Sequence, residues 1–307
     1  MSDDTPTVSV ITATYNRSSA LRYTIESLLR SHLEDWEQIV VGDGCTDDTE
    51  AVVHSFADPR VRFINLPHNT GDEAMPHNEG FRLARGRYIA YLNHDDLWLP
   101  EHLDTAVQGI EATGADLVNT LALSVAHDRP AVVLGSTPNG TYAPVVFVPQ
   151  STWLLRRSLL DEIGPWRQHS EVWTEPPQDL LVRAWRARKT LRTIARVTVI
   201  KLHARSRPGV YATREHDENR ARLEELVSEP DAVLRRLADA GVESAAASVD
   251  LRVWRHFRRA AINAAFKVAL SLRIPPVELK ARFTHRRRGA YFERWRRTVG
   301  LPPGHAS

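Results

Sequence analysis

Cysteine is almost absent from this chain, because Cys45 is the single one among 307 residues. One cysteine excludes a disulfide within the chain and is typical of proteins kept in a reducing compartment. The sequence also lacks any run near the roughly 20 consecutive apolar residues that cross a bilayer. No apolar signal-peptide core opens it. We therefore expect a cytoplasmic protein.

Two familiar nucleotide-binding signatures are missing as well. The sequence has no P-loop motif, which disfavours a kinase or an ATPase. Gly42 and Gly44 begin like the glycine fingerprint of dinucleotide-binding enzymes, but Asp47 stands at the third glycine position. This stretch also follows the second predicted strand instead of the first. A Rossmann dehydrogenase is therefore disfavoured.

Acidic residues are scarce near the C-terminus. Residues 250–307 hold 14 Lys and Arg against 3 Asp and Glu, whereas residues 1–249 hold 26 against 35. The net charge of +2 therefore hides a basic segment attached to an acidic body. We call residues 250–307 the basic tail.

The basic tail has two interpretations. Apolar residues recur at helical spacing between its arginines, and Tyr291, Phe292 and Trp295 follow them. An amphipathic helix with cationic flanks and aromatics fits an anionic membrane surface, which residues 250–297 would contact. The alternative is a set of ordinary helices packed on the rest of the chain. Nucleic acid is not expected as a partner, because the sequence has no recognised binding module and the body is acidic.

Apolar runs predict a sheet whose strands end in polar loops. The runs at 8–12, 38–41 and 88–92 predict buried strands, and apolar residues from Leu21 to Leu29 predict a helix between the first two. Strand, helix and strand form a βαβ unit. Asp43 follows the second run, and Asn93-His94-Asp95-Asp96 follows the third. Because open α/β sheets bind ligands outside the carboxyl ends of their strands, we expect a site there.

The adjacent acids Asp95 and Asp96 require a counter-charge, because an unpaired buried carboxylate is too costly. Divalent cations such as Mg²⁺ and Mn²⁺ prefer carboxylate oxygens. We expect Asp96, together with Asp95, to hold such a cation against a diphosphate. The alternative is that one of the two caps the segment that begins near Pro100.

Four motifs in order resemble the family 2 glycosyltransferases of the GT-A fold. They are the start Val8-Ser9-Val10-Ile11, the turn Tyr15-Asn16, the acidic loop 43–48 and the pair Asp95-Asp96. The resemblance implies an α/β fold with a mixed, mainly parallel sheet flanked by helices and a Rossmann-like nucleotide half. It implies a catalytic domain at 1–212, with a nucleotide-binding half at about 7–125 and an acceptor half at about 126–212. A basic helical extension would follow at 213–307.

The resemblance also implies an activity. A sugar would pass, with inversion, from a nucleotide-diphosphate sugar, a UDP-sugar first among them, to an acceptor hydroxyl, in a metal-dependent, hexosyltransferase-type reaction. Asp43 would accept a hydrogen bond from the base, which is uracil in the family, and Asp95 would contact ribose or the metal. The further nucleotide contacts expected are Thr12, Ala13, Thr14, Tyr15, Arg17, Gly44, Gly71, Asn78 and His94. His77 replaces an arginine of the family before Asn78, and it supplies charge only if protonated.

A general base is expected near residue 175, because an inverting transfer needs a carboxylate that removes the proton of the acceptor. Family members carry an acidic pair before a helix ending Leu-x-x-Arg, but Pro177 occupies the first acid's place here. The role therefore falls to Asp179, with Glu175 in reserve. The alternative is that Asp179 only caps the helix. His203, which ends a predicted strand at 197–203, would be a third metal ligand.

Two other classes of protein stay open. A nucleotidyltransferase on a related core would use the same carboxylates but release pyrophosphate from a nucleoside triphosphate. A non-catalytic membrane-surface protein would use the basic tail alone. Binding of the tail to a membrane would make the protein peripheral at the inner face of the cell membrane, with an envelope glycan or a lipid-linked molecule as the acceptor.

Overall fold

A computed structural model describes residues 5–126, 129–202, 217–228, 266–285 and 287–299. Its first half contains the strands and helices β1 (Val8–Thr14), α1 (Ser18–Leu29), β2 (Trp36–Gly42), α2 (Thr49–His54), β3 (Val61–Asn65), α3 (Ala74–Leu83), β4 (Tyr88–Tyr91), β5 (Asp96–Trp98), α4 (His102–Thr113) and β6 (Leu117–Ala126). Its second half contains β7 (Arg129–Leu134), β8 (Trp153–Arg156), α5 (Arg157–Ile163), α6 (Pro176–Arg186), β9 (Leu191–Leu202), α7 (Asp217–Ser228), α10 (Pro276–His285) and α11 (Ala290–Val299).

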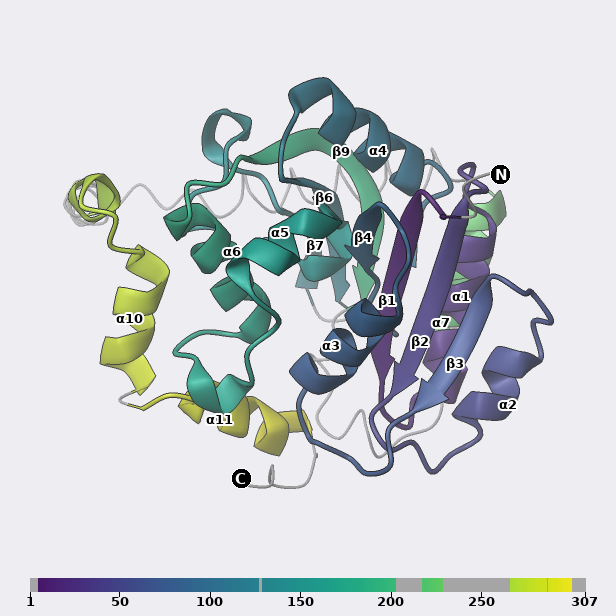
Figure 1. Ribbon diagram of the computed structural model, residues 1–307. Helices are drawn as coiled ribbons and strands as arrows, with labels where there is room; N and C mark the ends of the chain where they lie inside the picture. The colour runs from purple at the N-terminus through teal and green to yellow at the C-terminus, as the bar shows by residue number, and fades with distance from the viewer. Residues whose placement is uncertain (1–4, 127–128, 203–216, 229–265, 286, 300–307) are drawn as a thin grey trace.

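The described strands form one mixed sheet with the order β3-β2-β1-β4-β8-β6-β9-β5, and β7 pairs with β6 (Figure 1). β1 pairs in parallel with both β2 and β4, so the chain order reverses beside β1. Beyond β4 the pairing becomes antiparallel with β8. A reversal of strand order opens a crevice at the carboxyl ends of the strands, which is where such sheets bind ligands.

The sheet is covered by helices on both faces, because its central strands are apolar on both sides. Ile11, Ile39 and Ile89 face the layer of α3, α5 and α6. Their neighbours Val10 and Ala90 face the opposite layer, to which α4 belongs. Continuous apolar strands of this kind are typical of sheets buried on both faces. The expected α/β class with a mixed sheet is therefore confirmed.

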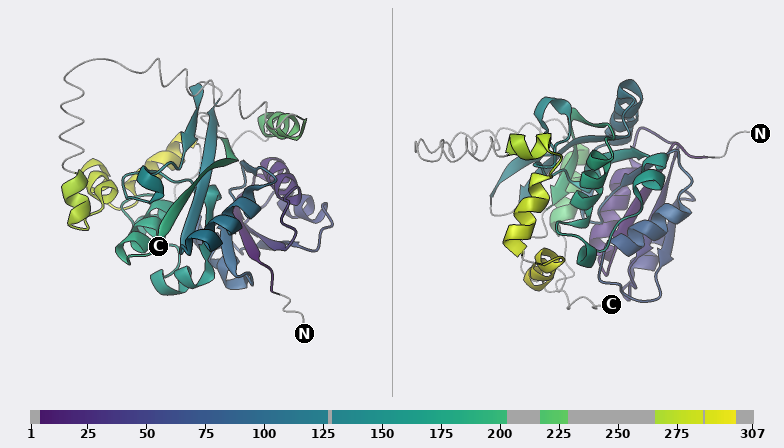
Figure 2. Two further views of the ribbon diagram at one scale, coloured as in Figure 1. Left: turned by 90° about the horizontal axis from the view of Figure 1, so that it is seen from above. Right: turned by 60° about the vertical axis from the view of Figure 1, so that its left-hand side comes forward.

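The described helices of the basic tail pack on the rest of the chain (Figure 2). Arg186 of α6 makes two hydrogen bonds of 2.9 Å to the Glu278 carboxylate of α10. The amide of Val277 donates to the carbonyl of Pro144 at 3.1 Å. The packed-helix interpretation therefore holds for α10 and α11. Residues 250–265 of the tail and the expected domain boundary near residue 212 lie outside the described residues.

Neither helix-cap alternative agrees with the structure. α4 begins at His102, and its N-cap residue is Glu101, so neither Asp95 nor Asp96 caps it. α6 begins at Pro176 with Glu175 as its N-cap residue, which places Asp179 inside the first turn. The acids must therefore be explained by other contacts. None of the helices in the described part of the chain is long and apolar enough to span a bilayer.

Candidate active site

A cavity of about 410 Å³ opens at the carboxyl ends of β1, β2 and β4. These ends contribute Ala13, Thr14, Tyr15, Asp43, Asn93, His94 and Asp95. The loop before α3, the start of α6, the end of β9 and helix α11 supply most of the remaining wall. The cavity is therefore built at the position that the strand order predicts.

Asp43 anchors the loop that precedes α3. Its Oδ1 accepts hydrogen bonds from the Thr70 amide at 2.9 Å and the Thr70 hydroxyl at 2.7 Å, and its Oδ2 accepts one from the Gly71 amide at 3.1 Å. Burial raises the pKa of the Asp43 carboxyl above its ordinary value, although these hydrogen bonds oppose the shift. Gly44 has a φ of +69°, and a Cβ there would lie 2.4 Å from the Asn69 amide nitrogen. Only glycine fits this contact between the two loops.

Asp95 and Asp96 have different surroundings. Asp95 lines the cavity, whereas Asp96 has an exposed fraction of 0% and does not line it. The Oδ2 of Asp96 accepts a hydrogen bond from the Ser151 hydroxyl at 2.6 Å and lies 3.1 Å from Lys201 Nζ. Burial disfavours ionised Asp95, but nearby cationic groups, Lys201 and Arg17 among them, hold its pKa below the ordinary value. The pair therefore divides into a cavity carboxylate and a carboxylate that forms a buried ion pair.

Lys201, at the end of β9, carries a positive charge into the cavity wall. Its β-strand partner is Asp96, so the ion pair follows from the register of β5 and β9. Burial opposes the charge, but the Asp96 and Asp95 carboxylates raise the pKa of the Lys201 ammonium. The group is therefore protonated at neutral pH. Lys201 was not among the residues expected from the sequence.

His94 joins β1 to β4. Its Nδ1 lies 3.2 Å from the carbonyl oxygen of Ala13, which can only accept, so Nδ1 carries the proton. Burial lowers the pKa of His94 below its ordinary value. The ring is therefore neutral and lies between the ends of β1 and β4, where the strand order reverses. Its contact with the nucleotide stays a prediction.

His77 does not supply the missing charge of the family arginine. It is 1% exposed and stacks on Trp166 with the ring centroids 4.6 Å apart. Burial lowers the pKa of His77 to about 3, so the ring is neutral at pH 7. Asn78 points elsewhere, because its side chain exchanges hydrogen bonds of 2.9 and 3.0 Å with the backbone of Trp166. A charge for the diphosphate must come from other residues.

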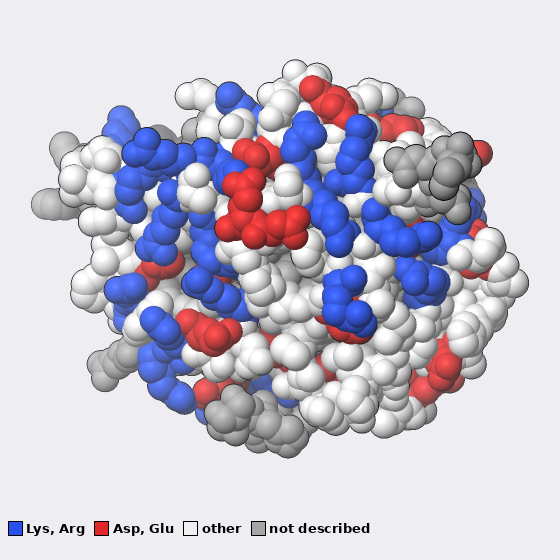
Figure 3. Space-filling model, viewed as in Figure 1, with Lys and Arg blue, Asp and Glu red and all other residues white. Residues whose placement is uncertain are grey.

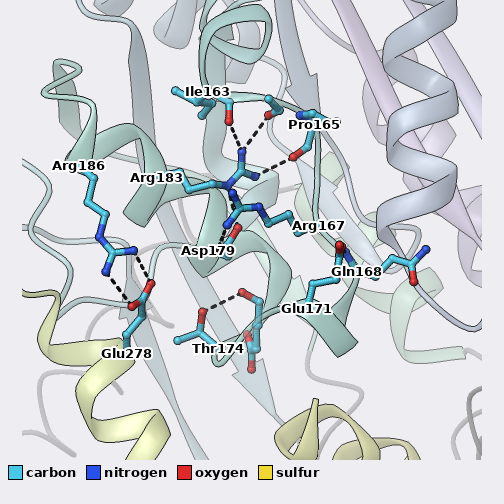
Figure 4. Close-up of polar contacts among 12 residues, drawn as sticks. Ile163, Pro165, Arg167, Gln168, Glu171, Thr174, Asp179, Arg183, Arg186 and Glu278 are labelled. Carbon is cyan, nitrogen blue, oxygen red and sulfur yellow. Dashed lines mark hydrogen bonds and ion pairs between the residues drawn. The ribbon is translucent and has the colours of Figure 1, made fainter. Parts of the chain in front are cut away.

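The two candidate bases also differ in position. Glu175 lines the cavity, whereas Asp179 does not. The Oδ2 of Asp179 accepts a hydrogen bond from Arg183 Nε at 2.8 Å, as Figure 4 shows. Arg183 also donates to the carbonyls of Ile163, Gly164 and Pro165. Asp179 therefore helps to hold α6 against the loop after α5, and the reserve residue Glu175 is the one that faces the cavity.

Glu73 is a further cavity carboxylate that sequence reasoning missed. It precedes α3, and its Oε2 lies 3.2 Å from the Gln150 side-chain nitrogen. Burial raises the pKa of Glu73 to about 7, and the nearby carboxylates of Asp72 and Glu175 add to this shift. The cavity thus gathers several acidic groups before any ligand enters.

The structure brings most of the expected residues to the cavity. Those that line it are Ala13, Thr14, Tyr15, Asp43, Gly71, His94, Asp95 and Glu175. Those that do not line it are Thr12, Arg17, Gly44, Asn78, Asp96 and Asp179. Thr12 is fully buried and accepts a hydrogen bond from the Gln38 side chain at 3.0 Å. His203 lies outside the described residues, and its role as a metal ligand stays a prediction.

Helix α11 was not expected at this site, although Tyr291, Phe292 and Arg296 line the cavity. The sequence shows these three residues only as part of a basic, aromatic helix. Arg296 contacts Gly71 from a position more than 200 residues away in the chain. A contact through a backbone carbonyl leaves no pattern in the sequence that could have revealed it.

The described residues fit a divalent cation in one arrangement. They contain no cluster of three His, Cys, Asp or Glu that could hold a metal by itself. Mg²⁺, however, is often bound by one or two carboxylates together with substrate phosphates. Asp95 faces the cavity and could serve in that way, whereas Asp96 already pairs with Lys201. Which carboxylate holds a metal stays a prediction.

Comparisons with known proteins agree with this geometry. The model of the family "Glycosyl transferase family 2" matches residues 9–164. The succinoglycan biosynthesis protein ExoO of Rhizobium meliloti is 37% identical over 115 residues, which cover 38% of this chain and 33% of that protein. The putative teichuronic acid biosynthesis glycosyltransferase TuaG of Bacillus subtilis is 34% identical over 105 residues, which cover 34% of this chain and 41% of that protein. The matched stretch thus spans well under half of either relative.

Solved structures show the same fold. S. aureus TarS 1-349 in complex with UDP-GlcNAc has a TM-score of 0.55 and 18% identity, over 72% of this chain and 65% of that one. The mannosyltransferase PcManGT from Pyrobaculum calidifontis, in complex with GDP-Man and Mn²⁺, has a TM-score of 0.53 and 16% identity, over 94% and 87%. These likenesses support the GT-A-type fold expected above. With its motifs and half of its length matched by the family model, the chain belongs to glycosyl transferase family 2.

Proposed function

We propose that this protein is an inverting glycosyltransferase that moves a sugar from a nucleotide-diphosphate sugar, with a UDP-sugar favoured, to an acceptor hydroxyl. One observation carries the proposal: Asp43, Asp95 and Glu175 come from three separate parts of the chain and line one cavity. Membership of the family supports sugar transfer as the reaction. The cavity of about 410 Å³ falls within the usual range of small-molecule sites.

The donor end of the cavity would be the end that Asp43 and Asp95 form. Asp43 keeps acceptor capacity for a ring N–H of the base, since each carboxylate oxygen has two lone pairs. Asp95 faces the position where a diphosphate would follow. A divalent cation bound between Asp95 and the phosphates would neutralise negative charge on the leaving group. We propose Mn²⁺ or Mg²⁺ for that position.

Glu175 would act on the acceptor. As the acceptor oxygen attacks the anomeric carbon, its proton passes to the Glu175 carboxylate, and the bond from that carbon to the phosphate oxygen breaks. The electron pair leaves with the nucleoside diphosphate, and attack from the opposite side inverts the anomeric centre. Asp179 is the less suitable base, because Arg183 holds its carboxylate away from the cavity.

The acceptor is proposed as a glycan or lipid-linked molecule of the cell envelope. Two relatives from Escherichia coli, WfgD and WfaP, are UDP-Glc:alpha-D-GlcNAc-diphosphoundecaprenol beta-1,3-glucosyltransferases by name. WfgD is 31% identical over 100 residues, which is 33% of this chain and 39% of that protein. A lipid-linked acceptor would require the enzyme to work beside a membrane.

The tail has a surface that is both apolar and basic. Leu279 and Phe283, one helical turn apart on α10, are 43% and 80% exposed. Val268 and Leu272, in the segment before α10, are 59% and 65% exposed. Lys and Arg side chains spread over the part of the surface where α10 lies (Figure 3). We propose that this surface touches anionic lipid, since apolar area and cationic charge act together in such binding.

Titration calorimetry with UDP, GDP and dTDP, each with Mn²⁺ and with EDTA, tests the donor site. We expect metal-dependent binding of one diphosphate, UDP first. Incubation with UDP-sugars should then release UDP, whereas release of pyrophosphate from a nucleoside triphosphate would point to a nucleotidyltransferase. Absence of binding to all three nucleotides would contradict the proposal.

Co-sedimentation with vesicles tests the membrane surface separately. The full chain should pellet with phosphatidylglycerol vesicles and stay in solution with phosphatidylcholine vesicles. Phe283→Glu with Leu279→Glu should reduce the pelleted fraction several-fold. Val132→Glu on β7 is the matched control, because Val132 is 51% exposed on another part of the molecule. An equal loss in both variants would exclude α10 as the membrane contact.

A further inference from the structure

Helix α11 forms one wall of the cavity. Arg296 is only 4% exposed, and its Nη1 donates a hydrogen bond to the carbonyl of Gly71. Gly71 in turn donates its amide to Asp43 at 3.1 Å. Arg296 therefore stands one residue away from the carboxylate that is expected to bind the base. In Figure 1 the arrows of β2 and β3 point towards the edge of the molecule where α11 lies.

Several contacts fix the position of α11 on the core. Phe292 packs on His169 with the ring centroids 4.2 Å apart. His169 Nδ1 lies 2.6 Å from Asp72 Oδ2, on the same loop as Gly71. The amide of Gly289, just before the helix, donates to the Val172 carbonyl at 3.2 Å. The helix thus joins the loop before α3 to the segment before α6, which are the donor and acceptor sides of the cavity.

Gly71 lies against the Arg296 guanidinium. Its φ is +71°, and a Cβ there would lie 2.9 Å from Arg296 Nη1. A side chain at this position would therefore be strained and would also collide with the guanidinium. The absence of a side chain leaves Arg296 room beside the loop.

The charges around the cavity indicate a function for Arg296. The five carboxylates that line it are Asp43, Asp72, Glu73, Asp95 and Glu175. Among the described lining residues, the cations whose charge does not depend on pH near neutrality are Lys201 and Arg296. Lys201 forms an ion pair with Asp96, with its Nζ 3.1 Å from Asp96 Oδ2. A diphosphate entering this acidic cavity needs a cation, and a guanidinium can bind phosphate oxygens with two parallel hydrogen bonds.

We infer that Arg296 binds the diphosphate of the donor, so that α11 completes the donor site from the far end of the chain. This inference rests on the proposed function, because it concerns the same ligand. It gives the basic tail a role inside the active site in addition to its surface. It also explains which residue supplies a positive charge to the diphosphate when the neutral His77 stands in place of the family arginine.

The experiment compares UDP with uridine on four full-length proteins: wild type, Arg296→Gln, Arg296→Lys and Arg297→Gln. Glutamine keeps an N–H donor for the Gly71 carbonyl but removes the charge, whereas lysine keeps the charge. Arg297 is the matched control, because it is the next residue of the same helix, is exposed, and donates to the Glu293 carbonyl at 3.3 Å. Each protein is titrated by calorimetry with Mn²⁺ present, and its melting temperature is measured.

We expect Arg296→Gln to weaken UDP binding about 10- to 100-fold, in line with the loss of one charge-assisted contact. Uridine binding and the melting temperature should stay at the wild-type values. Arg296→Lys should lie between wild type and Arg296→Gln, and Arg297→Gln should match wild type.

Three results would overturn the inference. Wild-type UDP binding by Arg296→Gln would show that the charge is not used. Equal weakening of UDP and uridine, or a lowered melting temperature with weakened UDP binding, would show that Arg296 acts only by holding α11 in place. A wild-type protein that binds no nucleotide diphosphate would remove the proposed donor site itself, which distinguishes that failure from the other two.

Discussion

The acids at β4–β5 and the acids at α6 have the same arrangement at the cavity. In the first pair Asp95 faces the cavity, and Asp96 lies behind it against Lys201. In the second pair Glu175 faces the cavity, and Asp179 lies behind it against Arg183. Each pair thus combines one carboxylate that lines the cavity with one carboxylate that forms a buried ion pair.

In this arrangement one of two neighbouring acids has a structural role and the other can bind a ligand. A carboxylate buried with a basic partner helps to define the local structure, and removing one partner leaves an uncompensated charge. A carboxylate at the cavity wall lies where a substrate can reach it. Substitutions in the two members of each pair should therefore produce different defects, in activity for one and in stability for the other.

The largest difference is expected between Asp95→Asn and Asp96→Asn. Asp95→Asn should lower UDP-sugar turnover about 1,000-fold or more and abolish the metal dependence of UDP binding, because the charge that faces the diphosphate is removed. Its melting temperature should stay near that of the wild type. Asp96→Asn should instead lower the free energy of unfolding by about 3 kcal/mol, because Lys201 loses its partner.

Urea unfolding and steady-state UDP release measure these two effects. A stable Asp96→Asn protein that has lost metal-dependent UDP binding would reverse the assignment and make Asp96 the metal ligand.

The second comparison sets Glu175→Gln against Asp179→Asn. Loss of the general base should reduce turnover in Glu175→Gln about 100- to 10,000-fold while UDP binding is retained. Asp179→Asn should keep most of its activity per folded molecule. Its free energy of unfolding should fall by about 3 kcal/mol, because Arg183 keeps its three carbonyl partners but loses the negatively charged partner Asp179. Turnover with UDP-sugar and urea unfolding give both quantities. The opposite pattern would restore Asp179 as the base.

A smaller effect concerns Glu73, whose pKa is raised to about 7. A carboxyl with a raised pKa in the folded state binds its proton more tightly there than in the unfolded chain. Its stabilising contribution is complete below the unfolded pKa and is lost as the pH rises through about 7. Between about pH 5 and pH 8 the wild type should lose about 2 to 3 kcal/mol relative to Glu73→Gln.

Thermal melting across this pH range measures the Glu73 effect. Glu50→Gln on α2 is the control, because Glu50 is exposed and should leave the pH profile of the wild type unchanged. Parallel curves for the wild type and Glu73→Gln would contradict the assignment of a raised pKa to Glu73.

The sequence predicted the nucleotide half well because local patterns determine it. The apolar runs at 8–12, 38–41 and 88–92 fall within or next to β1, β2 and β4, and the polar residues after them meet at the cavity. The strand β5 (Asp96–Trp98) was not predicted, because three residues that begin with an acid are too few to show a periodicity. Its partner β9 lies about 100 residues later, so the Asp96–Lys201 pair could not be derived from local spacing.

The choice within each acidic pair also depends on distant parts of the chain. Asp95 and Asp96 are equivalent in composition, and only the register of β5 with β9 directs Asp96 towards Lys201. Asp179 lies four residues before Arg183, a helical spacing that could have indicated an ion pair. The role of α11 had no such signal, since Arg296 contacts a backbone carbonyl.

We expect Asp95 and Arg296 to contact the donor while Asp96 stays paired with Lys201. A crystal structure of the wild type with UDP and Mn²⁺ tests it most directly. We expect the base beside Asp43, the metal between Asp95 and the diphosphate, and the Arg296 guanidinium on a phosphate oxygen. Nucleotide bound outside the cavity, or Asp96 turned away from Lys201 onto the metal, would contradict it.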